Sequence, residues 1–212
     1  MRFTPIDLAG WPRSEHYNHY MNNVPCTYSL TVQLDITAIR DAGLKLYPAM
    51  LYCLAREVNR RAEFRLRLDA EGRPGRFDVC HPCYTVFHRD AETFSNIWTE
   101  YSPDYAAFEA AYRADLARYG DVRAFSAKPG EPANTFPVSM IPWVEFTGFN
   151  LNLQYGFDYL APIFTLGRYR DEAGRRLIPL AIQVHHAACD GFHASRFVNE
   201  LQQLASDPAA WK

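Results

Sequence analysis

The stretch from Leu180 to His193 constrains the fold of this chain most. It reads LAIQVHHAACDGFH, in which an apolar and β-branched run is followed by small residues. A short apolar run that ends at turn formers is typical of a buried strand. A helical pattern then extends from about Gly191 to Ala205, with four apolar side chains that would face inward: Phe197, Val198, Leu201 and Leu204. The stretch therefore predicts a buried strand that leads through a turn into the final helix.

Two adjacent histidines stand where this apolar run ends. Successive side chains of a strand point to opposite faces, so only one of His185 and His186 can line a given cleft. His186 opens an H-x-x-x-D-G pattern that ends at Asp190 and Gly191. The residues between them are small, which leaves room for reactants beside the imidazole. Asp190 also precedes the final helix, where an aspartate suits the N-cap position.

Periodicity indicates one further strand and two further helices. Residues 28–36 alternate strictly between apolar and polar and predict a strand. Residues 47–60 carry apolar side chains at spacings of three and four and predict a helix. Another helix is expected over residues 102–119, with Ser102 as its N-cap and an aromatic stripe that faces the core.

The remaining segments give weaker signals of a mixed α/β fold. Strands are expected over residues 77–88, 136–153 and 161–169, and loops or turns over 69–76, 123–135 and 171–175. Prolines within 136–153 should confine that strand to an edge or a bulge.

Composition limits the classes of function that remain. The length suits one domain over residues 1–212, and no repeat or linker divides it. Hydrophobic residues make up 48% and aromatic residues 15% of the chain, which indicates apolar surface for a partner subunit or an apolar ligand. The formal net charge of −2 disfavours nucleic-acid binding. No run approaches the roughly 20 apolar residues of a membrane span, so we expect a cytoplasmic protein with free thiols at its five cysteines.

The histidine motif is one of several sequence matches that extend from Trp11 to Gln203. The string HHAACDGFH, which begins at His185, resembles the active-site signature of the chloramphenicol acetyltransferase family. The W-x-R-x-E-H motif from Trp11 and the S-x-x-P-W motif from Ser139 are similar to the same family. The resemblance implies an α/β two-layer sandwich, with a mixed β-sheet and helices packed on one face, as in CoA-dependent acyltransferases. It also implies a homotrimer with active sites between subunits.

The resemblance implies the transfer of acetyl from acetyl-CoA to the 3-hydroxyl of chloramphenicol by direct attack. The alcohol must lose a proton as it attacks the thioester, and an imidazole suits this task because its ordinary pKa is about 6.5. His186 is then the general base, and Ser139 stabilises the tetrahedral intermediate. The family pairs Asp190 with Arg13 in a structural ion pair.

Matched positions also suggest two binding regions. The mostly apolar set expected at the chloramphenicol pocket is Tyr20, Val24, Tyr28, Phe94, Phe125, Phe149, Leu151 and Leu153. The set expected near CoA is Trp143, Thr165 and Tyr169. Three positions depart from the family pattern: His19 replaces an aromatic residue, Asn96 a small one, and Pro137 a polar one.

Other readings of these residues carry less weight. A catalytic triad through Asp190 is disfavoured, because the resemblance pairs Asp190 with Arg13 and holds the imidazole of His186 by its own backbone carbonyl. We expect no metal, since His186 and Asp190 would converge only on a helix. Cys80 and Cys83 form an isolated C-x-x-C without the context of a redox site. Two other functions stay open: an acyltransferase with a different alcohol or amine acceptor, and a non-catalytic binder of an apolar drug.

Overall fold

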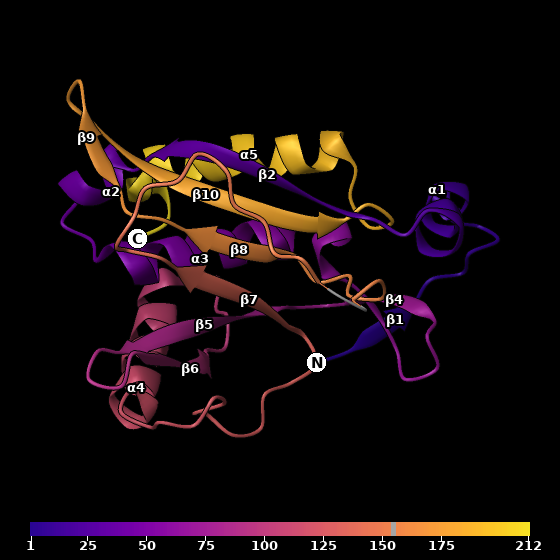
Figure 1. The fold of residues 1–212 in the computed structure, drawn as a ribbon, viewed down its shortest axis with the longest axis horizontal. Helices are drawn as coiled ribbons and strands as arrows, with labels where there is room; N and C mark the ends of the chain where they lie inside the picture. The colour runs from indigo at the N-terminus through magenta and orange to yellow at the C-terminus, as the bar shows by residue number, and fades with distance from the viewer. Residues whose placement is uncertain (154–155) are drawn as a thin grey trace.

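The structure is a computed structural model that describes residues 1–153 and 156–212. Its main feature is a seven-stranded mixed sheet in the order β2-β10-β8-β7-β5-β6, with β9 paired to β10 (Figure 1). These strands are β2 (Thr27–Asp35), β5 (His81–His88), β6 (Thr93–Trp98), β7 (Thr135–Met140), β8 (Ile163–Leu166), β9 (Arg170–Glu172) and β10 (Arg175–His185). β5, β7 and β8 run parallel to one another, and the other pairs are antiparallel.

Helices and a smaller sheet complete the chain. The α-helices are α1 (Ser14–Asn18), α2 (Thr37–Asp41), α3 (Leu46–Arg60), α4 (Tyr105–Tyr119) and α5 (Gly191–Ser206), with the short elements η1 (His19–Asn23), η2 (Ala62–Arg65) and η3 (Pro208–Ala210). The three-stranded antiparallel sheet has the order β1-β4-β3, formed by β1 (Phe3–Pro5), β3 (Leu66–Leu68) and β4 (Pro74–Phe77). The mixed α/β architecture expected from the sequence is confirmed.

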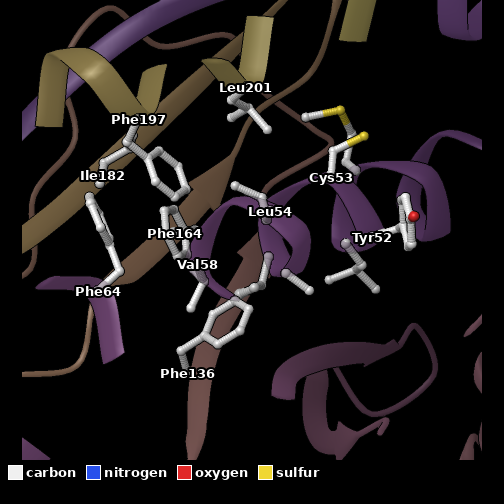
Figure 2. Close-up of a cluster of buried hydrophobic side chains, with 14 of the residues drawn as sticks. Tyr52, Cys53, Leu54, Val58, Phe64, Phe136, Phe164, Ile182, Phe197 and Leu201 are labelled. Atoms are coloured by element: carbon white, nitrogen blue, oxygen red, sulfur yellow. The ribbon is translucent and has the colours of Figure 1, made fainter. Parts of the chain in front are cut away.

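The hydrophobic core lies between the main sheet and the helices α3 and α5 (Figure 2). The rings of Phe164 on β8 and Phe197 on α5 stack with centroids 5.4 Å apart. Ile182 on β10 and Leu54 on α3 are buried in the same cluster. Burying each such side chain contributes roughly 1.5–3 kcal/mol to the stability of the fold. The apolar side chains identified in the sequence therefore hold the helices against the strands.

The opposite face of the sheet carries a row of small and polar residues that crosses six strands. The pairing register aligns Thr31, Ala181, Thr165, Ser139, Thr85 and Asn96 from β2 to β6. We call this set the cross-strand row. Its members are out of phase with the core residues Val138, Phe164 and Ile182, and side chains alternate between faces along a strand. The row therefore points away from α3 and α5.

Residues 149–153 cover one part of the cross-strand row. The backbone N–H of Phe149 donates to Oγ1 of Thr31 at 3.3 Å. The backbone N–H of Leu151 donates to Oε1 of Gln183 on β10 at 2.8 Å. These bonds hold the covering segment over β2 and β10.

Three element predictions need correction. The strand expected over 136–153 ends at Met140, and β7 is a central strand instead of an edge, although Pro137 lies within it opposite Cys83. Beyond Met140, residues 149–153 cover the sheet instead of extending it. The helix expected to begin at Ser102 starts at Tyr105, because the carboxylate of Asp104 accepts the backbone N–H of Ala107 at 3.0 Å and acts as N-cap.

A third correction concerns residues 77–88, which the sequence assigns to one strand. Phe77 ends β4 of the small sheet, whereas the strand of the main sheet begins at His81. The predictions for β2, α3 and α5 are confirmed to within about two residues, the usual uncertainty of an element boundary. The strand predicted from Leu180 is part of β10, which begins earlier, at Arg175. Leu204 and Val198 of α5 are only partly buried, whereas Phe197 and Leu201 are fully buried.

Candidate active site

The turn after β10 fixes the backbone around His186. The backbone N–H of His186 donates to the carbonyl of Cys26 at 3.0 Å, which ties the turn to the chain just before β2. The N–H groups of Ala188 and Cys189 both donate to the carbonyl of His185 at 3.0 Å. His186 is therefore held at the end of β10, next to η1 and the start of β2.

Two tyrosine rings fix the orientation of the His186 imidazole. The ring of Tyr20 stacks on it with centroids 3.8 Å apart and an interplanar angle of 10°. The ring of Tyr28 meets it edge-on, with centroids 5.3 Å apart. Burial raises the pKa of the Tyr28 hydroxyl, so this group stays protonated at neutral pH. The His186 side chain remains half-buried.

The hydrogen bond expected between the His186 ring and its own carbonyl is not formed. Within the described residues, Nδ1 of His186 is buried and has no hydrogen-bond partner. Asp190 does not orient the ring either, because its carboxylate contacts Arg13 and His193. The position of the imidazole in this chain thus depends on the tyrosine contacts and on the turn.

His185 has a different environment from its neighbour. Its side chain is 1% exposed, and its Nδ1 accepts the backbone N–H of Ala187 at 3.1 Å. Burial lowers the pKa of His185, and the backbone carbonyl of Phe157 opposes this effect. A neutral imidazole that accepts at Nδ1 carries its proton on Nε2. His185 is therefore a structural part of the turn.

Arg13 and Asp190 join the start of α1 to the start of α5. Nη1 of Arg13 donates to Oδ2 of Asp190 at 2.7 Å. Asp190 is the N-cap residue of α5, and Nδ1 of His193 lies 2.6 Å from its Oδ1. Burial alone would raise the pKa of Asp190, but the hydrogen bond and charge of Arg13, together with His193, hold this pKa below its usual range. The carboxylate therefore stays ionised beside the guanidinium.

Ser139 lies in the cross-strand row, near the end of β7. Its Oγ is 3.0 Å from Oγ1 of Thr165, which is almost fully buried. A cavity of about 250 Å³ opens beside Ser139 and is lined by Thr85, Asn96, Phe125 and other residues of β5 and β7. The serine hydroxyl therefore faces a space large enough for part of a small molecule.

A single chain does not bring His186 and Ser139 together. The row that contains Ser139 meets β10 at Ala181, five residues before His186, a distance of about 16 Å along a strand. The His186 ring contacts Tyr28, which pairs with Val184 on the face that carries the core. Ser139 points to the other face. The cavity beside Ser139 likewise contains neither Tyr20 nor His186.

The other expected site residues divide between these two regions. Tyr20 and Tyr28 contact His186, and Val24 is exposed next to them in the chain. Phe94 and Phe125 meet edge-on at 5.9 Å near the Ser139 cavity. Phe149, Leu151 and Leu153 belong to the segment that covers the cross-strand row.

The residues expected near CoA have three different environments. Trp143 is exposed and packs against Phe87. Thr165 contacts Ser139, and Tyr169 lies under the guanidinium of Arg40.

Sequence reasoning missed two residues that line these spaces. Thr85 lies beside Ser139 in the cross-strand row and lines the same cavity. Gln183 is 5% exposed, holds Leu151, and lines a second cavity of about 360 Å³ with Tyr28. Each is a polar residue within a largely apolar strand, and this pattern would have identified both from the sequence. The Nε2 of Gln183 has no hydrogen-bond partner in the described part of the chain.

Residues 1–153 and 156–212 contain neither a candidate metal site nor a helix that could span a membrane. No group of three or more histidine, cysteine, aspartate or glutamate side chains there is arranged to hold a metal ion. No helix among these residues combines the length and the apolar character needed to cross a bilayer.

Comparisons with known proteins identify the family. The family model described as chloramphenicol acetyltransferase matches residues 1–202. A chloramphenicol acetyltransferase of Vibrio anguillarum is 57% identical over 204 residues, covering 96% of this chain and 94% of its own. One from Campylobacter coli is 55% identical and covers 96% and 99% of the two chains.

Solved structures show the same fold. A chloramphenicol acetyltransferase structure superposes with a TM-score of 0.84 at 22% identity, covering 96% of this chain and all of its own. The dihydrolipoamide acetyltransferase of Azotobacter vinelandii superposes with a TM-score of 0.63 at 20% identity, covering 93% and 88% of the two chains. The sequence matches and the shared fold agree, and the chain belongs to the chloramphenicol acetyltransferase family.

Proposed function

We propose that this protein transfers acetyl from acetyl-CoA to the 3-hydroxyl of chloramphenicol, which inactivates the antibiotic and confers resistance. The structural observation that best supports this proposal is the half-buried imidazole of His186, which two tyrosine rings orient at the end of β10. Family membership supplies the substrate class, since curated relatives at 55–57% identity are chloramphenicol acetyltransferases.

His186 acts as the general base in the proposed reaction. Its imidazole removes the proton from the 3-hydroxyl as that oxygen attacks the thioester carbonyl, and then returns the proton to the departing CoA thiolate. The stacked ring of Tyr20 limits rotation of the imidazole during both transfers. The enzyme forms no covalent intermediate in this scheme, because the alcohol itself attacks the acetyl group.

Ser139 stabilises the charge that develops on the carbonyl oxygen. Its hydroxyl donates to the oxyanion of the tetrahedral intermediate, while the neighbouring Thr165 hydroxyl, 3.0 Å away, holds it in place. One preorganised donor of this kind is worth about 3 kcal/mol of transition-state stabilisation. Trp143, Thr165 and Tyr169 are proposed to face CoA, and the exposed rings near Ser139 to face the drug.

We infer that the active site forms between two subunits of a homotrimer. His186 and Ser139 point to opposite faces of one sheet, so one chain cannot place both on the same reacting atoms. A second copy that presents its His186 to the Ser139 cavity of the first would complete the site. Exposed aromatic residues near that cavity, Phe94 and Phe125, offer apolar surface for this contact.

Arg13 and Asp190 act as a structural ion pair in this proposal. They connect α1 with the turn that carries His186, so their effect on catalysis passes through the position of that turn. The chain is proposed to form one domain over residues 1–212 and to act in the cytoplasm, where acetyl-CoA is available.

The proposed function is tested by following CoA release with a thiol reagent. Purified protein is mixed with acetyl-CoA, with and without chloramphenicol, and the acetylated product is identified by mass spectrometry. Rapid release that depends on chloramphenicol supports the proposal. Release with other alcohols or amines but not with chloramphenicol would assign a different acceptor. Tight chloramphenicol binding without any release would indicate a sequestering protein.

A further inference from the structure

The cavity beside Ser139 has a polar far end formed by Asn96. Thr85 and Asn96 are directly opposed in the antiparallel pair of β5 and β6. The parallel register of β5 and β7 places Thr85 next to Ser139. Neighbouring strands lie about 4.8 Å apart, so Asn96 is two strands, or about 10 Å, from Ser139 along the cross-strand row.

The backbone of Asn96 is fixed, whereas its side-chain amide is uncommitted. Its N–H donates to the carbonyl of Phe125 at 2.6 Å, and its carbonyl accepts the N–H of Ala127 at 3.0 Å. Within the described residues, the amide group of Asn96 forms no hydrogen bond. A primary amide offers two donors and one acceptor, so this group can bind a ligand.

Some polar groups in or next to the cavity already have partners. The carboxylate of Glu131 accepts a hydrogen bond from the Thr135 hydroxyl at 2.7 Å. Ser139 and Thr165 are bonded to each other at 3.0 Å. Asn96 is a half-buried donor that remains available at the end of the cavity opposite Ser139.

We propose that Asn96 is a specificity-determining residue, which donates a hydrogen bond to a polar substituent at the far end of the acceptor's aromatic ring. This inference rests on the proposed function. When the reacting hydroxyl lies beside Ser139, an aryl ring joined to it through three carbons extends along the row toward Asn96. The para substituent then reaches the amide. In chloramphenicol this substituent is a nitro group, a weak acceptor, and a methylsulfonyl group in its place is a stronger one.

The test compares the activity of two enzymes on each of two acceptors, as in a double-mutant cycle. Wild type and Asn96→Leu are compared for kcat/KM with the methylsulfonyl analogue and with the analogue that has an unsubstituted phenyl ring. Leucine matches asparagine in size but cannot form a hydrogen bond. We expect the ratio of the two kcat/KM values to fall about fivefold, which corresponds to one neutral hydrogen bond of about 1 kcal/mol.

Two further variants make the result decisive. Asn96→Ala adds no bulk, so a similar fall in its ratio separates loss of the hydrogen bond from obstruction of the cavity. Asn199→Leu makes the same change on the exposed side of α5, and its ratio should equal that of wild type. Ratios for both Asn96 variants within twofold of wild type would overturn the inference while the proposed function stands. Absence of acetylation of any acceptor by wild type would instead reject both.

Discussion

His185 and His186 differ in their surroundings although they are adjacent in the chain. His185 is buried, and its Nδ1 is engaged by the backbone N–H of Ala187. His186 is half-buried between Tyr20 and Tyr28. Strand alternation predicted that only one of the two could serve a given cleft, but not which hydrogen bonds or stacking partners would distinguish them. The stacking partners of His186 come from η1 and β2, far away in the sequence.

Replacing His186 with alanine should remove the proposed general base. We expect kcat/KM to fall by about 10³- to 10⁴-fold, because proton transfer by a positioned side chain contributes about that much. The midpoint of thermal unfolding should change little, since the ring is only half-buried. Steady-state kinetics and a thermal melt check both expectations. Turnover at the wild-type rate in the folded variant would assign the base to another residue.

Replacing Ser139 with alanine should weaken stabilisation of the oxyanion. The expected result is a fall in kcat of about 10²-fold with KM for chloramphenicol nearly unchanged, because the hydroxyl acts in the transition state more than in the ground state. Ser195→Ala, on an exposed position of α5, is the matched control. A rise in KM with kcat preserved would mean that Ser139 binds substrate instead.

The elements predicted best are those with a clear local period. β2, α3 and α5 follow their apolar spacing closely. The strand predicted over 136–153 was too long, because β-forming residues beyond Met140 pack over the sheet instead of pairing within it. The strands of the small sheet have only three or four residues, too few to show any period, and their pairing joins the N-terminus to residues near position 75. Non-local pairing of this kind leaves no trace in a local pattern.

The ion pair of Arg13 and Asp190 should stabilise the junction of α1 with α5. We expect Arg13→Met to lower the unfolding midpoint by about 2–4 °C, the effect of roughly 1 kcal/mol in a chain of this size. The estimate is modest because Asp190 is 34% exposed and solvent screens the pair. Thermal unfolding at pH 7 provides the measurement, and Arg123→Met, at an arginine whose partner Asp90 is 73% exposed, is the comparison.

This stabilisation should also depend on pH. The pKa of Asp190 is lowered in the folded protein, so the contribution is fully present above the ordinary aspartate pKa of about 3.9. It is lost as the pH falls through the lower value in the folded state. The stability difference between wild type and Arg13→Met should therefore shrink on acidification. A difference that stayed constant down to unfolding would exclude the ion pair as its source.

At the scale of the whole molecule, the arrangement of the site depends on strand register. The sequence supplied His186 and Ser139 as candidates, but the faces to which they point follow from the pairing of β10 with β8 and of β8 with β7. A shift of one residue in either register would move Ser139 to the other face. Local patterns do not specify register across three strands. The argument for the proposed intersubunit site therefore comes only from the assembled sheet.

A mixing experiment tests this composite site. His186→Ala lacks the base but keeps the Ser139 cavity, and Ser139→Ala lacks the oxyanion donor but keeps the base. If each site combines His186 of one subunit with Ser139 of another, co-expression of the two variants should restore about a quarter of the sites in randomly mixed trimers.

The restored activity distinguishes an intersubunit site from a site within one chain. Mixed trimers should show about a quarter of the wild-type kcat, well above the level of either variant alone, because some interfaces pair an intact histidine with an intact serine. Mixing the purified variants without exchange of subunits should give only the sum of their residual activities. Mixed trimers that also gave only this sum would mean that both residues must come from the same chain. The opposite orientations of His186 and Ser139 would then have to be reconciled by a change in the sheet itself.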